Sequence, residues 1–208
     1  MSDARAEILG RIRSALGTER RAPEVPRDYL HTSGLSQREL VELFIERVTD
    51  YRAAVYRTAQ AQLTETVSEV CRLRGAARLV VPPDVPEDWM PGGLEFVRDA
   101  GLSYGELEGL DGVLSGCALA VAQTGTIVLD GGAAQGRRVL TLLPDLHLCV
   151  IFEAQIVGTV PEAVAALAHT STRPLTLISG PSATSDIELN RVEGVHGPRT
   201  LDIILVGP

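Results

Sequence analysis

The chain of 208 residues has few aromatic residues and few cysteines. Aromatic side chains make up 4% of the sequence, so leucine, valine, isoleucine and alanine must build the core, which favours a layered α/β fold over an aromatic-rich β-sandwich. The cysteines, Cys71, Cys117 and Cys149, are odd in number and widely spaced. None stands in a CxxC or Cys/His pattern with metal-ligand spacing, so no Fe–S or zinc site is encoded locally. We predict buried or half-buried free thiols in a reducing compartment.

Long apolar runs and a basic charge are also absent. No apolar stretch approaches the roughly 18 residues of a membrane span. The N-terminal 20 residues alternate charged and apolar side chains without the apolar segment of a signal peptide. We therefore expect a cytoplasmic protein without membrane insertion. The formal charge of −8 would repel a phosphate backbone, so no nucleic-acid partner is expected.

The common nucleotide-binding motifs are missing as well. The chain contains no GxGxxG after a strand and no GxxxxGKS/T. Dinucleotide binding and nucleoside-triphosphate binding therefore have no sequence support.

The sequence that is present divides into an arm, residues 1–35, and a single α/β domain, residues 36–208. Residues 3–16 predict a short amphipathic helix, and residues 18–35 predict an extended, mobile linker because they carry prolines, a glycine and many polar groups. Such an arm usually packs on its own body or on a partner subunit.

The domain begins with a capping box, Ser36–Glu39, at the start of a helix. Helices and short Val/Leu/Ile strands then alternate, which is typical of β–α units with parallel pairing. We expect an open, mainly parallel sheet flanked by about five helices. The predicted elements are strands at 53–56, 77–81, 117–122, 127–129, 148–152, 175–179 and 201–206, helices at 64–74 and 161–169, a helix or turn and then a short strand within 93–107, and a turn or short helix at 110–116.

Two polar segments interrupt the apolar pattern. The first, Gln123-Thr124-Gly125-Thr126, joins two predicted strands. Its glycine allows close backbone approach, and its hydroxyls and amides could bind a phosphate or carboxylate. The alternative is a hairpin turn whose threonines satisfy their own backbone.

The second segment, Ser179–Pro198, is too rich in glycine, proline, hydroxyls and acids for a regular helix or strand. It follows a strand end, where open α/β sheets place ligands. His196 lies between glycines and could shuttle a proton or cap loop carbonyls. The candidate ligand-binding residues of this segment are Gly180, Ser182, Thr184 and Asp186.

Two further residues are candidates. Glu153 ends an apolar strand that begins beside His147, and could act as a nucleophile, a base or a helix-terminus partner. Arg138, which follows a glycine-rich loop, could bind an anion through its fork of N–H donors or lie on the surface.

These motifs together resemble the lactate-utilisation protein C family, the LUD-domain proteins. The motifs that carry the resemblance are Ala122–Thr126, Arg137-Arg138 to Leu143-Pro144, His147 with Leu148–Phe152, Ser179–Ser182, Thr184, Asp186–Glu188 and Gly194–Pro198. They stand in the family's order over residues 110–208, and the N-terminal helix also suits the family.

The resemblance implies a fold like that of ribose-phosphate isomerases, glucosamine-phosphate deaminases and CoA transferases. In the isomerase relatives a Thr/Ser/Gly turn cradles a phosphate, and Gln123–Thr126 could be its counterpart. The family is linked to bacterial growth on L-lactate, together with two partner subunits that resemble Fe–S proteins. The longer relatives carry cysteine-rich motifs that this chain lacks, so we expect it to bind no cofactor itself.

Two hypotheses follow. In the first, the chain is a non-redox subunit of a cytoplasmic system that oxidises L-lactate to pyruvate, where it binds a small carboxylate or phosphate or supports the Fe–S subunits. In the second, it is a free-standing isomerase- or CoA-transferase-like enzyme that binds an anionic substrate, with His196 or Glu153 as its catalytic residue.

Overall fold

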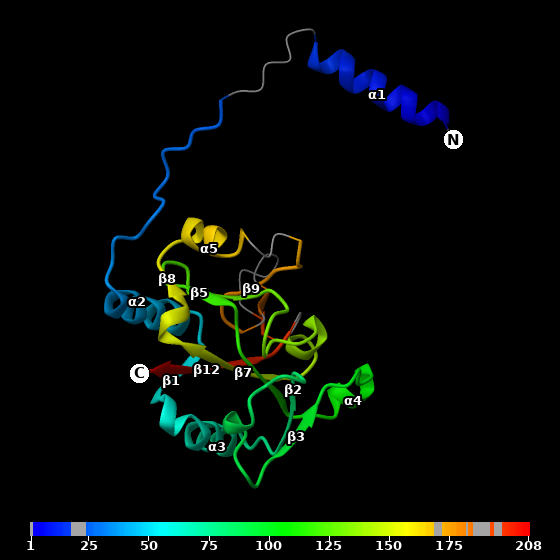
Figure 1. The fold of residues 1–208 in the computed structure, drawn as a ribbon. Helices are drawn as coiled ribbons and strands as arrows, with labels where there is room; N and C mark the ends of the chain where they lie inside the picture. Colours follow the sequence, from blue (N-terminus) through cyan, green and yellow to red (C-terminus); the bar gives the residue numbers. More distant parts are fainter. Residues whose placement is uncertain (1, 18–23, 169–171, 182, 185–191, 194–196) are drawn as a thin grey trace.

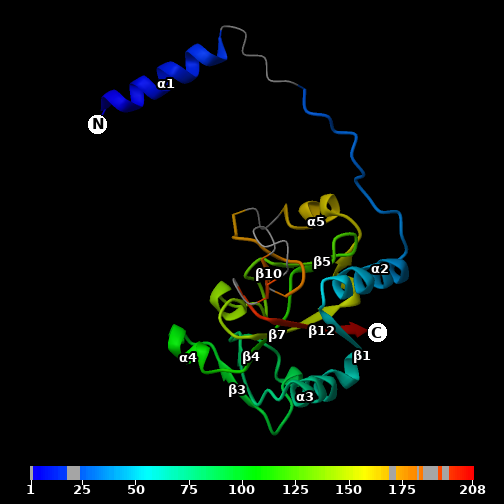
Figure 2. The same cartoon turned by 180° about the vertical axis from the view of Figure 1, so that it is seen from behind.

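The structure, a computed structural model, describes residues 2–17, 24–168, 172–181, 183–184, 192–193 and 197–208. The predicted N-terminal helix is α1 (Ser2–Leu16), which lies apart from the body (Figures 1 and 2). Residues 24–35 form no helix or strand. Their last part joins the body, because the Ser33 amide donates to the Glu162 carboxylate at 3.1 Å and the Thr159 hydroxyl donates to the His31 carbonyl at 3.3 Å.

The centre of the body is a six-stranded sheet in which every pairing is parallel. Its strands, in spatial order, are β1 (Ala54–Ala59), β12 (Thr200–Gly207), β7 (Leu146–Phe152), β4 (Gly112–Ser115), β2 (Arg78–Val81) and β3 (Glu95–Arg98). The long central strands β7 and β12 are buried almost throughout, since both faces of the sheet are covered. The predicted mainly parallel sheet is confirmed.

One face of this sheet is covered by α3 (Leu63–Arg74). The apolar stripe of the helix packs against strand residues such as Leu148 and Ile204, and Trp89 and Phe152 close one end of this layer. The helix ends, as predicted, at Gly75, whose φ of +67° is the left-handed conformation that a glycine C-cap supplies.

The other face is covered by α2 (Gln37–Asp50) and a second sheet. The predicted capping box at Ser36 and Glu39 begins α2. The second sheet has the order β8-β5-β6-β9, and α5 (Val160–Ala166) packs on its outer side. Its strands are β5 (Leu119–Val121), β6 (Thr126–Leu129), β8 (Ile156–Val157) and β9 (Thr176–Ile178). The sequence predicted three of these strands but not that they leave the parallel sheet.

Shorter elements complete the body. They are α4 (Tyr104–Glu108), the strand pair β10 (Ala183–Thr184) and β11 (Val192–Glu193), and 3-10 turns at Gln60–Gln62, Glu87–Trp89, Arg138–Thr141 and Glu153–Gln155.

Two predicted segments are wrong. Residues 110–116, predicted as a turn or short helix, contain the buried strand β4. Its Gly112 lies so close to β7 that an added Cβ would stand 2.9 Å from Leu146, so the glycine serves close strand packing. Within 93–107 the strand precedes the helix, because a second capping box at Ser103 and Glu106 starts α4 only after β3 has ended.

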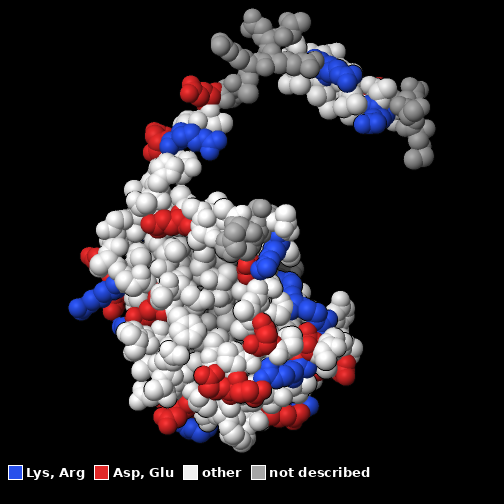
Figure 3. Space-filling view, in the orientation of Figure 1, with Lys and Arg blue, Asp and Glu red and all other residues white. Residues whose placement is uncertain are grey.

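The cysteine prediction is confirmed for Cys71, Cys117 and Cys149, which are buried free thiols. Among the described residues, no helix is long and apolar enough to cross a membrane. Figure 3 shows the face of the body that is turned toward the viewer in Figure 1. Uncharged side chains cover much of the middle of that face, and acidic side chains gather over its lower part.

Candidate functional site

The predicted polar turn, Gln123–Thr126, is the tight connection of the β5–β6 hairpin. Gly125 has a φ of +59°, and an added Cβ would lie 2.9 Å from the Cβ of Arg47 and 3.0 Å from the Val48 amide nitrogen of α2. The glycine is therefore required for packing of the turn against α2. Gln123 is fixed to the body as well, because its backbone N–H donates to the Gly158 carbonyl at 3.0 Å.

The two threonines of the turn connect the hairpin to the start of the second polar segment. The hydroxyls of Thr124 and Thr126 are 2.8 Å apart, and the Thr126 hydroxyl is also 2.8 Å from that of Ser179, which follows β9. The two predicted polar segments thus meet through a chain of hydroxyls, although Thr126 and Ser179 are 53 positions apart in the sequence. Thr126 is buried, so this contact positions Ser179.

Ser179 forms part of the wall of a hollow of about 230 Å³, which we call the Arg138 hollow. It lies beside the first residues of β7 and β12, between the parallel sheet and the end of β9. The described residues that line it are Arg138, Thr141, His147, Leu177, Ile178, Ser179, Gly180, Pro181, Gly197, Pro198 and Leu201. Arg138 and Gly180 of the predicted binding residues therefore meet here, but at the amino ends of the parallel strands, whereas the sequence suggested a carboxyl end.

The charge of the hollow comes from Arg138. Its Nη1 donates to the carbonyl and the hydroxyl of Thr141 at 2.8 and 3.1 Å, both neutral groups. No carboxylate of the described residues forms an ion pair with it, and partial burial lowers the pKa of its guanidinium. A partly desolvated cation without a counter-charge attracts an anion.

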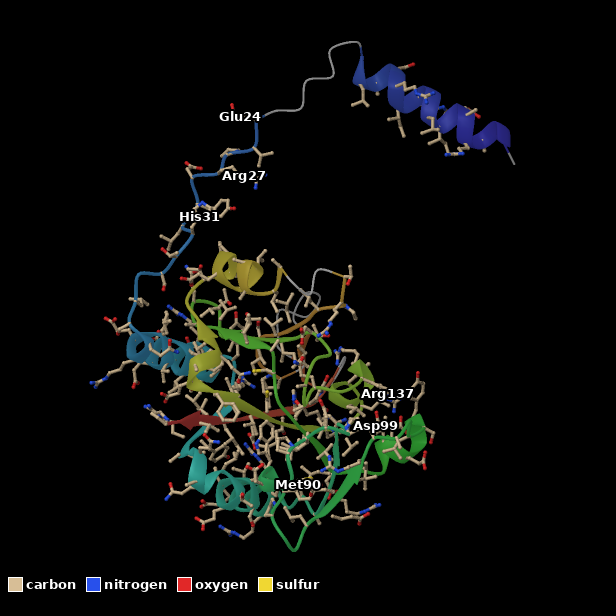
Figure 4. The ribbon with its side chains drawn as sticks, viewed as in Figure 1. Glu24, Arg27, His31, Met90, Asp99 and Arg137 are labelled. Carbon is tan, nitrogen blue, oxygen red and sulfur yellow. The ribbon has the colours of Figure 1, made fainter. Side chains whose placement is uncertain are left out.

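The preceding residue, Arg137, is arranged in the opposite way. Its Nε and Nη2 donate to the two carboxylate oxygens of Asp99 at 2.6 and 2.7 Å (Figure 4). Asp99 is buried, and the Arg137 guanidinium followed by the amides of Gly101 and Leu102 lowers its pKa. Arg137 is thus neutralised and structural, and of the two adjacent arginines only Arg138 offers its charge to a ligand.

The floor of the Arg138 hollow contains a buried polar cluster. His147 is 1% exposed, and its Nε2 lies 2.8 Å from the Ser115 hydroxyl. Behind it, hydrogen bonds with Cys117, His147 and Ser115 lower the pKa of the Cys149 thiol, while the hydrogen bond to Cys149 and burial raise that of Cys117. The contact with Ser115 holds the His147 ring, which therefore gives the floor a fixed polar group.

Glu153 is not part of this hollow. It begins the turn after β7, and its carboxylate pairs with Arg57 at 3.1 Å. Arg57 also pairs with Glu42 of α2 at 3.2 Å. Glu153 therefore belongs to an ion-pair network at the opposite, carboxyl ends of β7 and β1, far along the strand from the residues that line the Arg138 hollow.

Several predicted site residues cannot be placed. Ser182, Asp186 and His196 lie outside the described residues, and of Thr184 only the backbone, in β10, is described. Their proposed roles stay predictions. Within the described part of the chain, no group of three or more His, Cys, Asp or Glu side chains could hold a metal ion.

The sequence did not single out several residues of the hollow. Thr141, Leu177 and Leu201 line it, yet each lies in an ordinary apolar or hydroxyl-bearing stretch. Besides the segment that begins at Ser179, the available signal was the pair Arg137-Arg138 directly after a glycine-rich loop, which marked the right place without showing which arginine is free.

Comparison with protein families places the chain. The model of the LUD domain matches residues 102–206. A lactate utilization protein C from Deinococcus radiodurans is 46% identical over 209 aligned residues, covering 99% of this chain and 97% of that protein. A protein of the same name from Anoxybacillus flavithermus is 28% identical, covering 96% and 97%.

A solved structure shows the same fold. The crystal structure of a DUF162 family protein from Deinococcus radiodurans superimposes with a TM-score of 0.74 at 43% identity, covering 83% of this chain and 99% of that one. Family model, relatives and fold agree, and the chain therefore belongs to the LUD-domain family, among the proteins named lactate utilization protein C.

Proposed function

We propose that this chain is a non-redox component of an L-lactate utilisation system and binds a small carboxylate in the Arg138 hollow. The supporting observation is the guanidinium of Arg138, which faces this hollow with neutral partners only among the described residues. The names of the relatives point to lactate. L-Lactate and its oxidation product pyruvate are both small carboxylates of the kind that an arginine fork binds.

The size of the hollow supports a small ligand. Its volume of about 230 Å³ lies below the roughly 300–1,000 Å³ of pockets for drug-sized molecules. Ser179 adds a hydroxyl and Gly180 a backbone without a side chain, which suit the oxygen atoms of a hydroxy acid. Leu177, Ile178 and Leu201 would supply apolar contacts for the methyl group of L-lactate.

Calorimetric titration with L-lactate, pyruvate and inorganic phosphate tests this proposal. Arg138→Gln removes the charge, and we expect binding to weaken at least about tenfold, as for loss of a hydrogen bond to a charged group. Arg72→Gln is the matched control, because it removes an exposed arginine of α3 outside the hollow. Equal affinity in the Arg138→Gln variant would contradict the proposal.

The proposal extends to partner subunits that carry Fe–S clusters. The three cysteines are buried free thiols, and no group of three or more His, Cys, Asp or Glu side chains among the described residues could hold a metal ion, which is compatible with electron transfer on other chains. Its α1 offers a contact surface, since Ile8, Ile12 and Leu16 recur every four residues and are 58%, 48% and 59% exposed.

Co-purification tests the partner proposal. We expect Ile8→Glu with Ile12→Glu to reduce the iron and sulfide that accompany the protein from lactate-grown cells. Ser14→Glu, on the opposite side of α1, adds the same charge and serves as control. Absence of iron–sulfur protein with the unmodified chain would contradict this part.

The structure offers less support for the isomerase- or CoA-transferase-like alternative. Its candidate nucleophile, Glu153, is paired with Arg57 and lies outside the Arg138 hollow. The chain contains no lysine, so a lysine Schiff base is not available either. We expect the Glu153→Gln variant to bind the small carboxylate like the unmodified chain. Loss of a measured turnover in this variant would favour the alternative.

A further inference from the structure

A second, larger hollow lies at the carboxyl ends of the parallel strands, and none of the predicted site residues lines it. We call it the Trp89 hollow. Its volume is about 670 Å³, within the range of pockets for cofactor-sized molecules. It opens where β2, β4 and β7 end, the edge at which α/β sheets generally bind ligands. Its lining includes Asp84, Trp89, Asp130, Ala133, Phe152 and Arg173.

A buried ionic anchor holds one side of this hollow. The Asp130 side chain is 8% exposed, and its Oδ1 accepts hydrogen bonds from the Gly132 amide at 2.9 Å and from Gln135 Nε2 at 2.8 Å. Its Oδ2 lies 3.4 Å from Nη1 of Arg173. The long distance and the 53% exposure of Arg173 leave most of its donors directed to solvent or to a ligand.

The backbone of the loop that carries Asp130 is tightly constrained. Gly132 has no room for a Cβ, which would lie 2.8 Å from Asp130 Oδ1. Ala134, which is not a glycine, has a φ of +57°. It is held there by two hydrogen bonds, its amide donating to Asp84 at 2.9 Å and its carbonyl accepting from the Gly116 amide at 2.7 Å. A strained residue fixed from both sides is typical of a binding loop.

The opposite side of the hollow is aromatic. Trp89 and Phe152 form a tilted pair with ring centroids 6.1 Å apart, and both line the hollow. Asp84, exposed at the end of β2, uses one oxygen for Ala134 and keeps an acceptor for a hydroxyl group. A flat apolar wall, a carboxylate acceptor and an arginine therefore surround one space.

We propose that the Trp89 hollow binds a molecule that joins an aromatic ring to an anionic group through a hydroxylated spacer, as a nucleoside monophosphate does. The ring lies against Trp89 and Phe152, the hydroxyl groups donate to Asp84, and the anion binds Arg173. This site is separate from the Arg138 hollow, and neither depends on the other.

Trp89 makes the proposal directly testable, because it is the single tryptophan of the chain and lines this hollow but not the Arg138 hollow. The probe is adenosine 5′-monophosphate, followed by tryptophan emission and by calorimetry. We expect saturable quenching, with adenosine, which lacks the anion, and ribose 5-phosphate, which lacks the ring, each binding at least about tenfold more weakly.

Two variants address the site from different sides. Arg173→Gln removes the anion partner and should weaken binding of the probe at least about tenfold. Ala133→Leu, at an exposed residue of the lining, fills space without changing charge and should weaken it too. Arg138→Gln should leave it unchanged. Thermal unfolding of each variant shows that the fold is intact.

The results that would overturn the proposal are distinct. The first is that neither adenosine 5′-monophosphate nor the aromatic anion 8-anilinonaphthalene-1-sulfonate quenches Trp89 up to about 1 mM. The second is that ribose 5-phosphate binds as tightly as the probe. The third is a loss of probe binding in Arg138→Gln with none in Arg173→Gln. The last result would place the anion in the Arg138 hollow.

Discussion

The Arg138 hollow and the Trp89 hollow lie at opposite ends of the same parallel strands and differ in how they hold an arginine. Arg138 donates to neutral groups of Thr141, whereas Arg173 is held beside the buried carboxylate of Asp130. The first hollow is small with an unneutralised cation, and the second is larger with an aromatic wall. This difference in the charge around the arginine is the reason for proposing a small carboxylate as the ligand of the first hollow and a larger molecule as the ligand of the second.

The largest effect on stability is expected at the hairpin beside the first hollow. Gly125→Ala combines a positive φ with a Cβ 2.9 Å from Arg47, and should lower the free energy of unfolding by about 3 kcal/mol. Gly131→Ala is the matched control, since its φ is +67° with open space around it, and should cost about 1 kcal/mol. Urea unfolding measures both. If the two variants are equally stable, the turn does not pack on α2 as described.

Substitution of Arg137 should affect stability more than substitution of Arg138. Arg137→Gln leaves the buried Asp99 carboxylate with its amide partners only, and should lower the free energy of unfolding by clearly more than Arg138→Gln, though by less than the loss of a fully buried pair because Arg137 is partly exposed. Arg138→Gln should change it by less than about 0.5 kcal/mol. Urea unfolding of both variants tests this, and the reverse order would show that the two arginines have been assigned the wrong roles.

The same pair predicts a pH dependence. Arg137 and then the backbone amides lower the pKa of Asp99 in the folded state, so its contribution is fully present above the unfolded-state value of about 3.9. It is lost as the pH falls below that value toward the folded-state pKa. The stability difference between the unmodified chain and Arg137→Gln should therefore be constant at neutral pH and shrink in acid. A difference that grows as the pH falls would contradict this assignment.

The smallest effect is expected where the hairpin meets the wall of the Arg138 hollow. Thr126→Val removes two hydroxyl contacts, to Thr124 and Ser179, and should lower the free energy of unfolding by about 1 kcal/mol. Thr124→Val removes one of them and should cost less. Thermal unfolding compares the two, and a larger loss in Thr124→Val would contradict the geometry.

The parts of the fold that the sequence predicted are those with local signals. The capping box at Ser36, the C-cap at Gly75 and the buried apolar strand β7 each have a pattern within a few residues. The strand β4 was mistaken for a turn because Gly112 serves contact with Leu146, a residue distant in sequence. The division into two sheets also depends on such long-range pairing.

The candidate site was likewise predicted only in part. The hydroxyl contact of Thr126 with Ser179 joins the two segments that the sequence marked. Whether an arginine is free depends on partners elsewhere in the chain, so Arg137 and Arg138 could not be told apart. The Trp89 hollow was missed because its residues come from three separate stretches without a shared motif, around Asp84 and Trp89, at Asp130 and at Arg173.

A calorimetric titration of L-lactate into the unmodified chain, Arg138→Gln and Arg173→Gln tests most directly whether the Arg138 hollow binds the small carboxylate. We expect Arg138→Gln to weaken binding of L-lactate at least about tenfold and Arg173→Gln to bind it like the unmodified chain. Unchanged binding in Arg138→Gln, or a loss confined to Arg173→Gln, would contradict the assignment of the small carboxylate to the Arg138 hollow.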